Sequence, residues 1–216
     1  MTLIEKVKAV LFSPSMFFQR IKAEVEIIEA FKYLIILSIV YIVMSFVSTF
    51  LFYYLLSSIF YGMGYYPYTS MMPMYGIPGI FSFIMYGFIF VALIIGPFIT
   101  AAIMHVLTKI FGGKNDFSAT YKVTVYSMTP TLIIGWMPYV GIFASFYAWY
   151  LYIKGLSILH DISIGRAFLV TLIPIIIIVM IVGALVFLFL TTIMTPIGMV
   201  PTGEIFSILS KYFGMY

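Results

Sequence analysis

Long uncharged runs dominate the pattern of hydrophobic and polar positions along the chain. From Tyr33 to Thr108 no Asp, Glu, Lys or Arg occurs over 76 consecutive residues. Because about 20 apolar residues are enough for one helix to cross a bilayer, this run must cross more than once. The pattern predicts a first span over Tyr33–Phe60, a second over Ile80–Leu107 and a last one over Phe168–Met194.

A further uncharged stretch lies between Lys122 and Lys154 and encloses 31 residues. As one straight helix it would be about 46 Å long, against a hydrocarbon core of about 30 Å. Its centre, Gly135–Gly141, holds a tryptophan and a tyrosine that suit a membrane interface. We expect a hairpin of two short spans, with Pro138 in the turn, Pro130 within the third span, and both lysines reaching the headgroups.

Lys and Arg residues divide unequally between the two sides of the membrane. With five spans the inner side holds ten of them and the outer side one, whereas four spans give nine and two. Both counts obey the positive-inside rule, so the four-span alternative stays open. We expect an all-α polytopic transmembrane helical bundle of five spans with the N-terminus inside. Its parts would be a cytoplasmic amphipathic segment at 1–32, a membrane domain at 33–195 and an outer interfacial tail at 196–216.

The segment before the first span has a different pattern. Ser13 and Pro14 suit the start of a helix, and apolar residues then recur every three or four positions as far as Phe31. This predicts an interfacial amphipathic helix on the inner surface, preceded by a shorter helix that Thr2 and Glu5 begin as a capping box. Such a helix either docks a soluble partner or senses lipid packing, or it only anchors the first span.

The composition agrees with a membrane protein. Hydrophobic residues make up 64% of the chain and charged residues 8%, with a mean hydropathy of +1.18, whereas about 25% of residues are charged in soluble domains. Glu5, Lys6 and Lys8 interrupt what would be the core of a signal peptide, so no cleaved signal is expected. There is no cysteine, which excludes disulfides and thiolate chemistry. The excess of Lys and Arg over Asp and Glu is explained by the orientation of the protein in the membrane, so no nucleic-acid partner is expected.

Two histidines are the main candidates for chemistry. His105 lies near the inner boundary of the second span, where an ionisable group suggests a proton relay, although contact with a headgroup or a carbonyl is the more ordinary role. His160 and Asp161 lie in an inner loop with Arg166. They would bind an anionic headgroup or a partner, or else Asp161 or Ser163 would cap the next helix.

Other candidates are weaker. The spans hold no pair of carboxylates and no nucleophile beside a base, so catalysis is not expected. Methionines at 63, 71, 72 and 74 suit Cu(I), but no histidine or cysteine accompanies them, and neither a metal nor a cofactor is expected. Each proline inside a span frees the carbonyl four residues earlier, which for Pro130 is that of Tyr126. These carbonyls would be satisfied by water in a central cavity or by the nearby hydroxyls of Thr100, Ser127, Thr129, Thr131 and Thr171.

Several segments carry a resemblance to a known family: LFSPSMFFQRIKAE, FSATYKVTVYSMTP and MPYVGIFASFYAWYLYIKGLSILHDISIGRAF. They resemble the Yip-domain family, membrane proteins whose eukaryotic members interact with Ypt/Rab GTPases in the early secretory pathway. The most specific matches are Tyr126, Ser127, Pro130, Pro138, Gly141, Tyr150, Gly155, Leu156 and His160. The resemblance covers nearly the whole chain and implies a five-span bundle with a cytoplasmic N-terminus. The short N-terminal region is similar to the compact archaeal or bacterial members.

These observations lead to one main expectation about function. The chain would be a non-enzymatic integral membrane protein, in a prokaryotic cell membrane, that organises membrane or recruits partners. The alternative is a channel or transporter for a small solute. Partners would be the lipid bilayer, a cytoplasmic protein and a second copy of the chain. The candidate functional residues are Tyr126, Pro130, Pro138, Gly141, Gly155, His160, Asp161 and His105.

Overall fold

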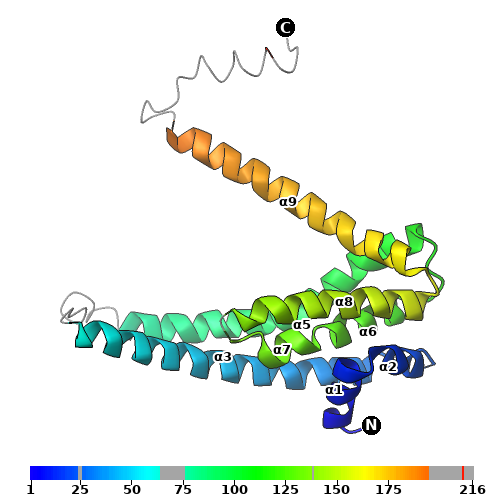
Figure 1. Ribbon diagram of the computed structural model, residues 1–216, viewed down its shortest axis with the longest axis horizontal. Helices are drawn as coiled ribbons and strands as arrows, with labels where there is room; N and C mark the ends of the chain where they lie inside the picture. The colour runs from blue at the N-terminus through cyan, green and yellow to red at the C-terminus, as the bar shows by residue number, and fades with distance from the viewer. Residues whose placement is uncertain (24–25, 64–75, 138, 195–210, 212–216) are drawn as a thin grey trace. The chain divides into compact units, whose positions relative to one another are not determined.

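The structure is a computed structural model of the 216-residue chain, and it describes residues 1–23, 26–63, 76–137, 139–194 and 211. All regular structure in this described part is helical (Figure 1). The chain divides into two units, Met1–Val170 and Thr171–Tyr216. The predicted loop after the first span and the predicted outer tail lie largely outside the described residues.

The three uncharged runs form long helices as predicted. They are α3 (Ile28–Gly62), α5 (Gly76–Ile110) and α9 (Ile164–Met194). Pro97 and Pro174 lie inside α5 and α9. With α8 (Val140–His160), four of the described helices are long and apolar enough to cross a membrane. The most apolar stretch of α9 contains no buried residue, as expected of a surface that faces lipid.

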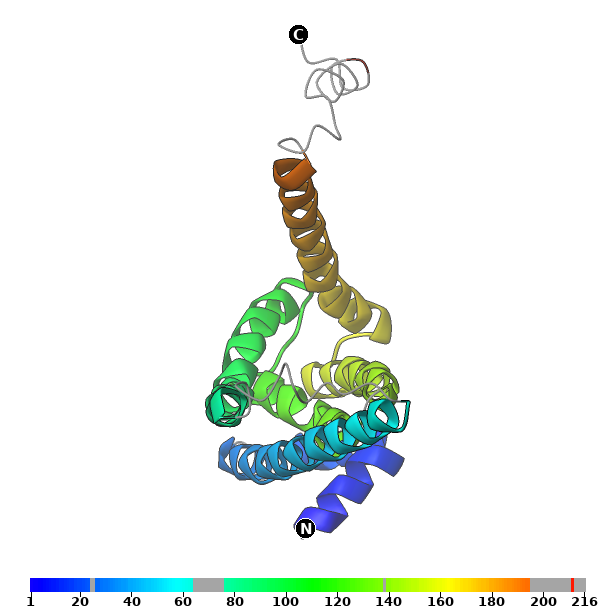
Figure 2. The same cartoon turned by 90° about the vertical axis from the view of Figure 1, so that its left-hand side faces the viewer.

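The stretch between Lys122 and Lys154 is a hairpin and not one helix. It consists of α6 (Phe117–Ser127), α7 (Thr129–Ile134) and α8. Regular helix stops at Ile134 and resumes at Val140, so the stretch is not one long kinked helix. The returning helix α8 packs against both α6 and α7 (Figure 1, Figure 2).

The N-terminal segment forms two short helices, α1 (Leu3–Phe12) and α2 (Pro14–Ile21). The predicted capping box is present: the Thr2 hydroxyl accepts from the Glu5 N–H at 3.3 Å, and the Glu5 carboxylate accepts from the Thr2 N–H at 2.9 Å. Pro14 occupies the first turn of α2, where its missing N–H costs no hydrogen bond. The expectation of one amphipathic helix from Ser13 to Phe31 was wrong, because α2 ends at Ile21.

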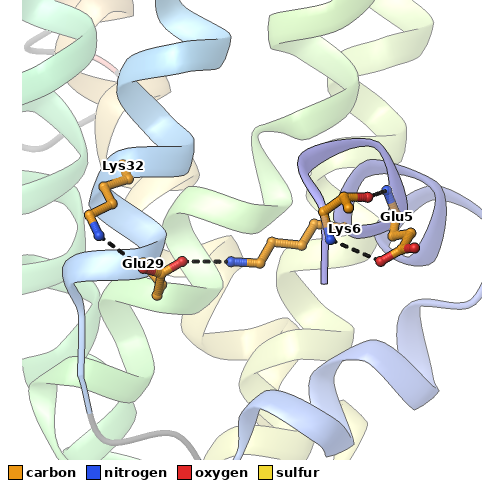
Figure 3. A network of polar contacts seen from close by, with 5 residues as sticks. Glu5, Lys6, Glu29 and Lys32 are labelled. Atoms are coloured by element: carbon orange, nitrogen blue, oxygen red, sulfur yellow. Dashed lines mark hydrogen bonds and ion pairs between the residues drawn. The ribbon is translucent and has the colours of Figure 1, made fainter.

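An ionic contact joins α1 to the start of α3. Lys6 Nζ lies 3.1 Å from one carboxylate oxygen of Glu29, and Lys32 Nζ lies 3.1 Å from the other (Figure 3). A carboxylate shared by two ammonium groups fixes the first helix against the first span. Figure 1 shows α1 leaving the side of the bundle, crosswise to the long helices, while α2 runs along it.

The buried core of the first unit lies where α2, α3, α6 and α8 meet. Phe17, Phe18 and Ile21 are buried there, so the apolar face of α2 covers the bundle itself. The Phe17 ring lies 4.8 Å from the Tyr126 ring, centroid to centroid, in an edge-on arrangement that aromatic pairs favour. This packing supports the reading of the N-terminal segment as an anchor of the first span.

Candidate functional site

A chain of polar contacts joins the two histidines of the sequence. His105 lies near the end of α5, Thr120 in α6, and His160 is the last residue of α8. The Thr120 hydroxyl lies 2.8 Å from His105 Nδ1 and 2.9 Å from His160 Nε2, and the ring centroids are 6.0 Å apart. Thr120 and His160 are fully buried. One hydroxyl of α6 therefore connects α5 and α8 through the two histidines of the sequence.

The Thr120 hydroxyl determines the direction of both hydrogen bonds. Thr120 has one hydroxyl proton, so it donates to one imidazole and accepts from the other. If it donates to His105, then His160 carries its proton on Nε2, and the reverse order places that proton on Nδ1. His160 Nδ1 has no hydrogen-bond partner among the described residues. Changing from one order to the other also requires each imidazole to exchange a proton at its second ring nitrogen, which for His160 is the buried Nδ1.

The described side chains around the two histidines do not form a metal-binding group. Within the described residues, no group of three or more His, Cys, Asp or Glu side chains could hold a metal ion. The methionine-rich loop, for which no metal was expected, lies outside these residues except for Met63. The hydrogen-bonded pair is thus suited to passing or holding protons through Thr120 and lacks the third ligand that zinc sites use.

Asp161 and Ser163 shape the turn between α8 and α9. Asp161 ends α8 in the left-handed region at φ 53°, which a short polar side chain tolerates better than most. Its carboxylate lies 2.5 Å from Lys22 Nζ, and this ammonium group holds the pKa of Asp161 below its usual value. The Ser163 hydroxyl accepts from the Arg166 N–H at 3.3 Å. The capping role is confirmed for Ser163, whereas Asp161 ties this turn to the end of α2.

The break between α6 and α7 satisfies its own polar groups. Pro130 stands in the first turn of α7, and the Thr129 hydroxyl donates to the Tyr126 carbonyl at 2.6 Å. Of the hydroxyls predicted for this role, Thr129 is thus the partner. The Tyr33 hydroxyl lies 2.8 Å from the Thr129 hydroxyl. Since that hydroxyl donates to the carbonyl, Tyr33 donates to it in turn. Tyr126 is fully buried, with its ring 5.0 Å from that of Tyr33.

Gly155 lies at the closest approach of α8 to its neighbours. A Cβ built on it would lie 2.8 Å from Val123 Cγ1 and 2.9 Å from Phe18 Cζ. Glycine therefore allows α2, α6 and α8 to meet at one point. Lys122 is also buried here, and its Nζ donates to the Ile21 carbonyl at 3.0 Å. The prediction that Lys122 reaches the headgroups was wrong, because its ammonium group binds the end of α2 instead.

Gly141 closes the turn between α7 and α8. A Cβ on Gly141 would lie 2.7 Å from the Gly135 carbonyl oxygen, and its N–H donates to the Met137 carbonyl at 3.1 Å. Tyr139 has a φ of 65° in this turn, a conformation that bulky residues rarely adopt. Pro138, the other residue predicted here, lies outside the described residues. The two glycines permit a tight return of the chain.

Thr120 and Lys22 were not identified from the sequence. Thr120 had a detectable signal, since Thr120, Thr124 and Ser127 follow an i, i+4, i+7 spacing and all three are buried. A polar stripe on an otherwise apolar helix faces the interior of a bundle. Lys22 had no such signal, because its partner is 139 positions away.

Comparison with known families covers all of these residues. A family model described as the Yip1 domain matches residues 8–187, which is 180 of the 216 residues. The chain belongs to the Yip1-domain family. The family is associated with membrane trafficking and is not known for enzymes. Its match and the four apolar helices make this chain an integral membrane protein. No curated protein and no solved structure matches the chain.

Proposed function

We propose that this Yip1-domain protein is a non-enzymatic membrane organiser of five spans, whose N-terminal corner acts as a wedge in the inner leaflet. The proposal rests on the placement of α1 and α2. Their buried face is fixed to the bundle, and their outer face carries Ile4, Phe12 and Met16, which are 66%, 81% and 67% exposed. Exposed apolar residues beside the exposed bases Lys8 and Arg20 are typical of helices that lie in a membrane interface.

The depth of the corner supports the wedge. The Tyr147 hydroxyl donates to the Leu11 carbonyl at 2.5 Å, so the corner between α1 and α2 lies beside Tyr147 of α8. Tyr147 precedes Lys154, the charged residue of α8, by seven residues, which is about 10 Å along a helix axis. With Lys154 at the headgroups, the corner would lie within the inner half of a hydrocarbon core of about 30 Å. Apolar bulk in one leaflet only favours curved membrane.

The connection of the elements supports the proposal of five crossings. The pair Lys22–Asp161 puts the turn after α8 at the same end as the N-terminal segment. If α8 crosses the membrane, the chain must first cross in the opposite direction to reach Val140, where α8 begins. The segment formed by α6 and α7 supplies that path. The break at Met128 divides this path into pieces of 11 and 6 residues, each shorter than a full span. The third crossing would thus be a broken helix. The Thr129 hydroxyl donates to the Tyr126 carbonyl, which Pro130 leaves without its helical partner.

Curvature sorting tests the wedge. The purified protein is reconstituted into fluorescent liposomes of mixed diameter, and its density is measured vesicle by vesicle. We expect enrichment on small vesicles, and loss of this enrichment in the Phe12→Ser/Met16→Ser variant. The matched control is Ile99→Ser/Ile103→Ser, which removes exposed apolar groups from the span α5 instead. A wild-type density that does not depend on diameter would contradict the proposal.

Transport of protons is the second candidate, and the His105–Thr120–His160 chain favours it. Liposomes that contain the protein and a trapped pH-sensitive dye would then respond to an imposed pH step faster than empty liposomes. Thr120→Ser keeps a hydroxyl between the imidazoles and should conduct, whereas Thr120→Val should not. Equal leakage of empty and loaded liposomes would rule out this function.

A further inference from the structure

The turn between α5 and α6 gathers positive charge that the described part of the chain does not neutralise. Lys109 at the end of α5 and Lys114 in the turn are exposed, and Lys109 Nζ donates to the Lys114 carbonyl at 3.2 Å. Neither lysine has an ion pair among the described residues. Among the described residues, the hydrogen bond from Lys109 to the Lys114 carbonyl uses only one of the donors of these two side chains.

Arg166 adds a third cation from another element. It lies in the first turn of α9 and is exposed, and a Cβ built on Gly112 would lie 3.4 Å from its Nη1. The guanidinium group thus rests against the turn between Lys109 and Lys114. It has no ion pair in the described structure either. The acidic residues of this region are Asp116 and Asp161, and Asp161 forms an ion pair with Lys22. The local charge stays positive.

An exposed apolar stripe leads to this cluster. Ile103, Val106 and Ile110 follow one face of α5 at 55%, 60% and 72% exposure, and Ile110 is adjacent to Lys109. Ile164 at the start of α9 is 53% exposed beside Arg166. The apolar stretch of α5 ends at Ile110, and that of α9 begins at Ile164. A cationic cluster that ends an apolar stripe has the two parts required to bind a phospholipid, one for the phosphate and one for the acyl chains.

We infer that Lys109, Lys114 and Arg166 form a binding site for the phosphate of an anionic phospholipid. Arg166 supplies a planar fork of donors, which suits phosphate oxygens, and the two lysines add charge. A zwitterionic lipid carries the same phosphate with a compensating cation, so the net positive charge of the site favours an anionic headgroup. The site is separate from the proposed wedge at Phe12 and Met16, and neither depends on the other.

Lipid binding to the full chain tests the inference. The protein is purified in detergent and titrated with phosphatidylglycerol or with phosphatidylcholine of the same acyl chains, and bound lipid is counted by native mass spectrometry. We expect preferential binding of phosphatidylglycerol, weakened roughly tenfold by Arg166→Gln because a charge-assisted pair to phosphate is lost. Lys114→Gln, which keeps the backbone N–H of the turn, should weaken it in the same direction.

Lys32→Gln is the matched control for Lys114→Gln, because Lys32 is an exposed lysine outside the cluster and outside α1 and α2. An equal loss for Lys32→Gln and Lys114→Gln would show only general attraction to a basic surface and overturn the site. Equal binding of the two lipids would also overturn it. Glycerol 3-phosphate is added as a competitor: weak competition supports a lipid, whereas competition as strong as that of the lipid itself means a site for soluble phosphates. Unchanged melting of the variants confirms that they are folded.

Discussion

Single residues set the distances between the helices of this bundle, and Gly155 is the clearest case. An added methyl group would meet Val123 and Phe18 below 3 Å, and a buried overlap costs about 1–3 kcal/mol. Alanine also favours a helix over glycine by about 1 kcal/mol, which offsets part of that cost. We expect Gly155→Ala to lower the melting temperature of the protein in detergent.

The control for Gly155 is Gly87→Ala in α5, where an added Cβ has nothing within 4 Å. That variant gains helix propensity without an overlap and should melt at or above the temperature of the wild type. Val123→Ala removes one of the two groups that crowd position 155, so it should cost less in the Gly155→Ala background than alone. Equal stability of Gly155→Ala and Gly87→Ala would refute the packing role of Gly155.

At the scale of elements, one ion pair connects the end of α2 with the turn after α8. The Lys22 ammonium group lowers the pKa of Asp161, so the pair stabilises the fold above the ordinary Asp pKa of about 3.9. This contribution is lost as the pH falls through the lower pKa of the folded state. Both side chains are more than a third exposed, so we expect less than about 1 kcal/mol.

Asp161→Asn tests this contribution, because asparagine keeps the shape of the side chain and also tolerates the left-handed backbone. The wild type should melt above the variant at pH 6, and the two should converge as the pH falls below about 4. Lys22→Gln should lower the melting temperature at pH 6 by the same amount as Asp161→Asn. The double variant should melt at nearly the same temperature as either single variant. A gap between wild type and Asp161→Asn that persists at low pH would show that another property of Asp161 matters.

The sequence was sufficient for the elements that depend on local chemistry. Uncharged runs longer than a bilayer crossing predicted α3, α5 and α9, and Thr2 with Glu5 predicted the cap of α1. Pro130 indicated that the Tyr126 carbonyl needs a hydroxyl partner, and Thr129 supplies it. Contacts between distant segments were not predictable in this way. Thr120 meets His160 across 40 positions and Lys122 meets Ile21 across 101, and nothing in the local pattern of either segment specifies its partner.

For the whole molecule, the decisive question is how many times the chain crosses the membrane. The absence of cysteine makes single cysteine variants clean reporters. Tyr139, 83% exposed in the turn between α7 and α8, and Ser163, exposed after α8, lie at opposite ends of α8. With five spans and the N-terminus inside, an impermeant thiol reagent applied to intact cells should label Tyr139→Cys. It should reach Ser163→Cys only after the cells are permeabilised.

Lys114→Cys in the turn between α5 and α6 completes this experiment, because both four and five spans place it inside. Labelling of Ser163→Cys alone in intact cells would mean that α6 and α7 do not cross, which would remove the basis for a third span. Labelling of Lys114→Cys and Ser163→Cys together, without Tyr139→Cys, would instead keep five spans and reverse the orientation. The wedge of Phe12 and Met16 would then lie in the outer leaflet, where it would favour curvature of the opposite sign.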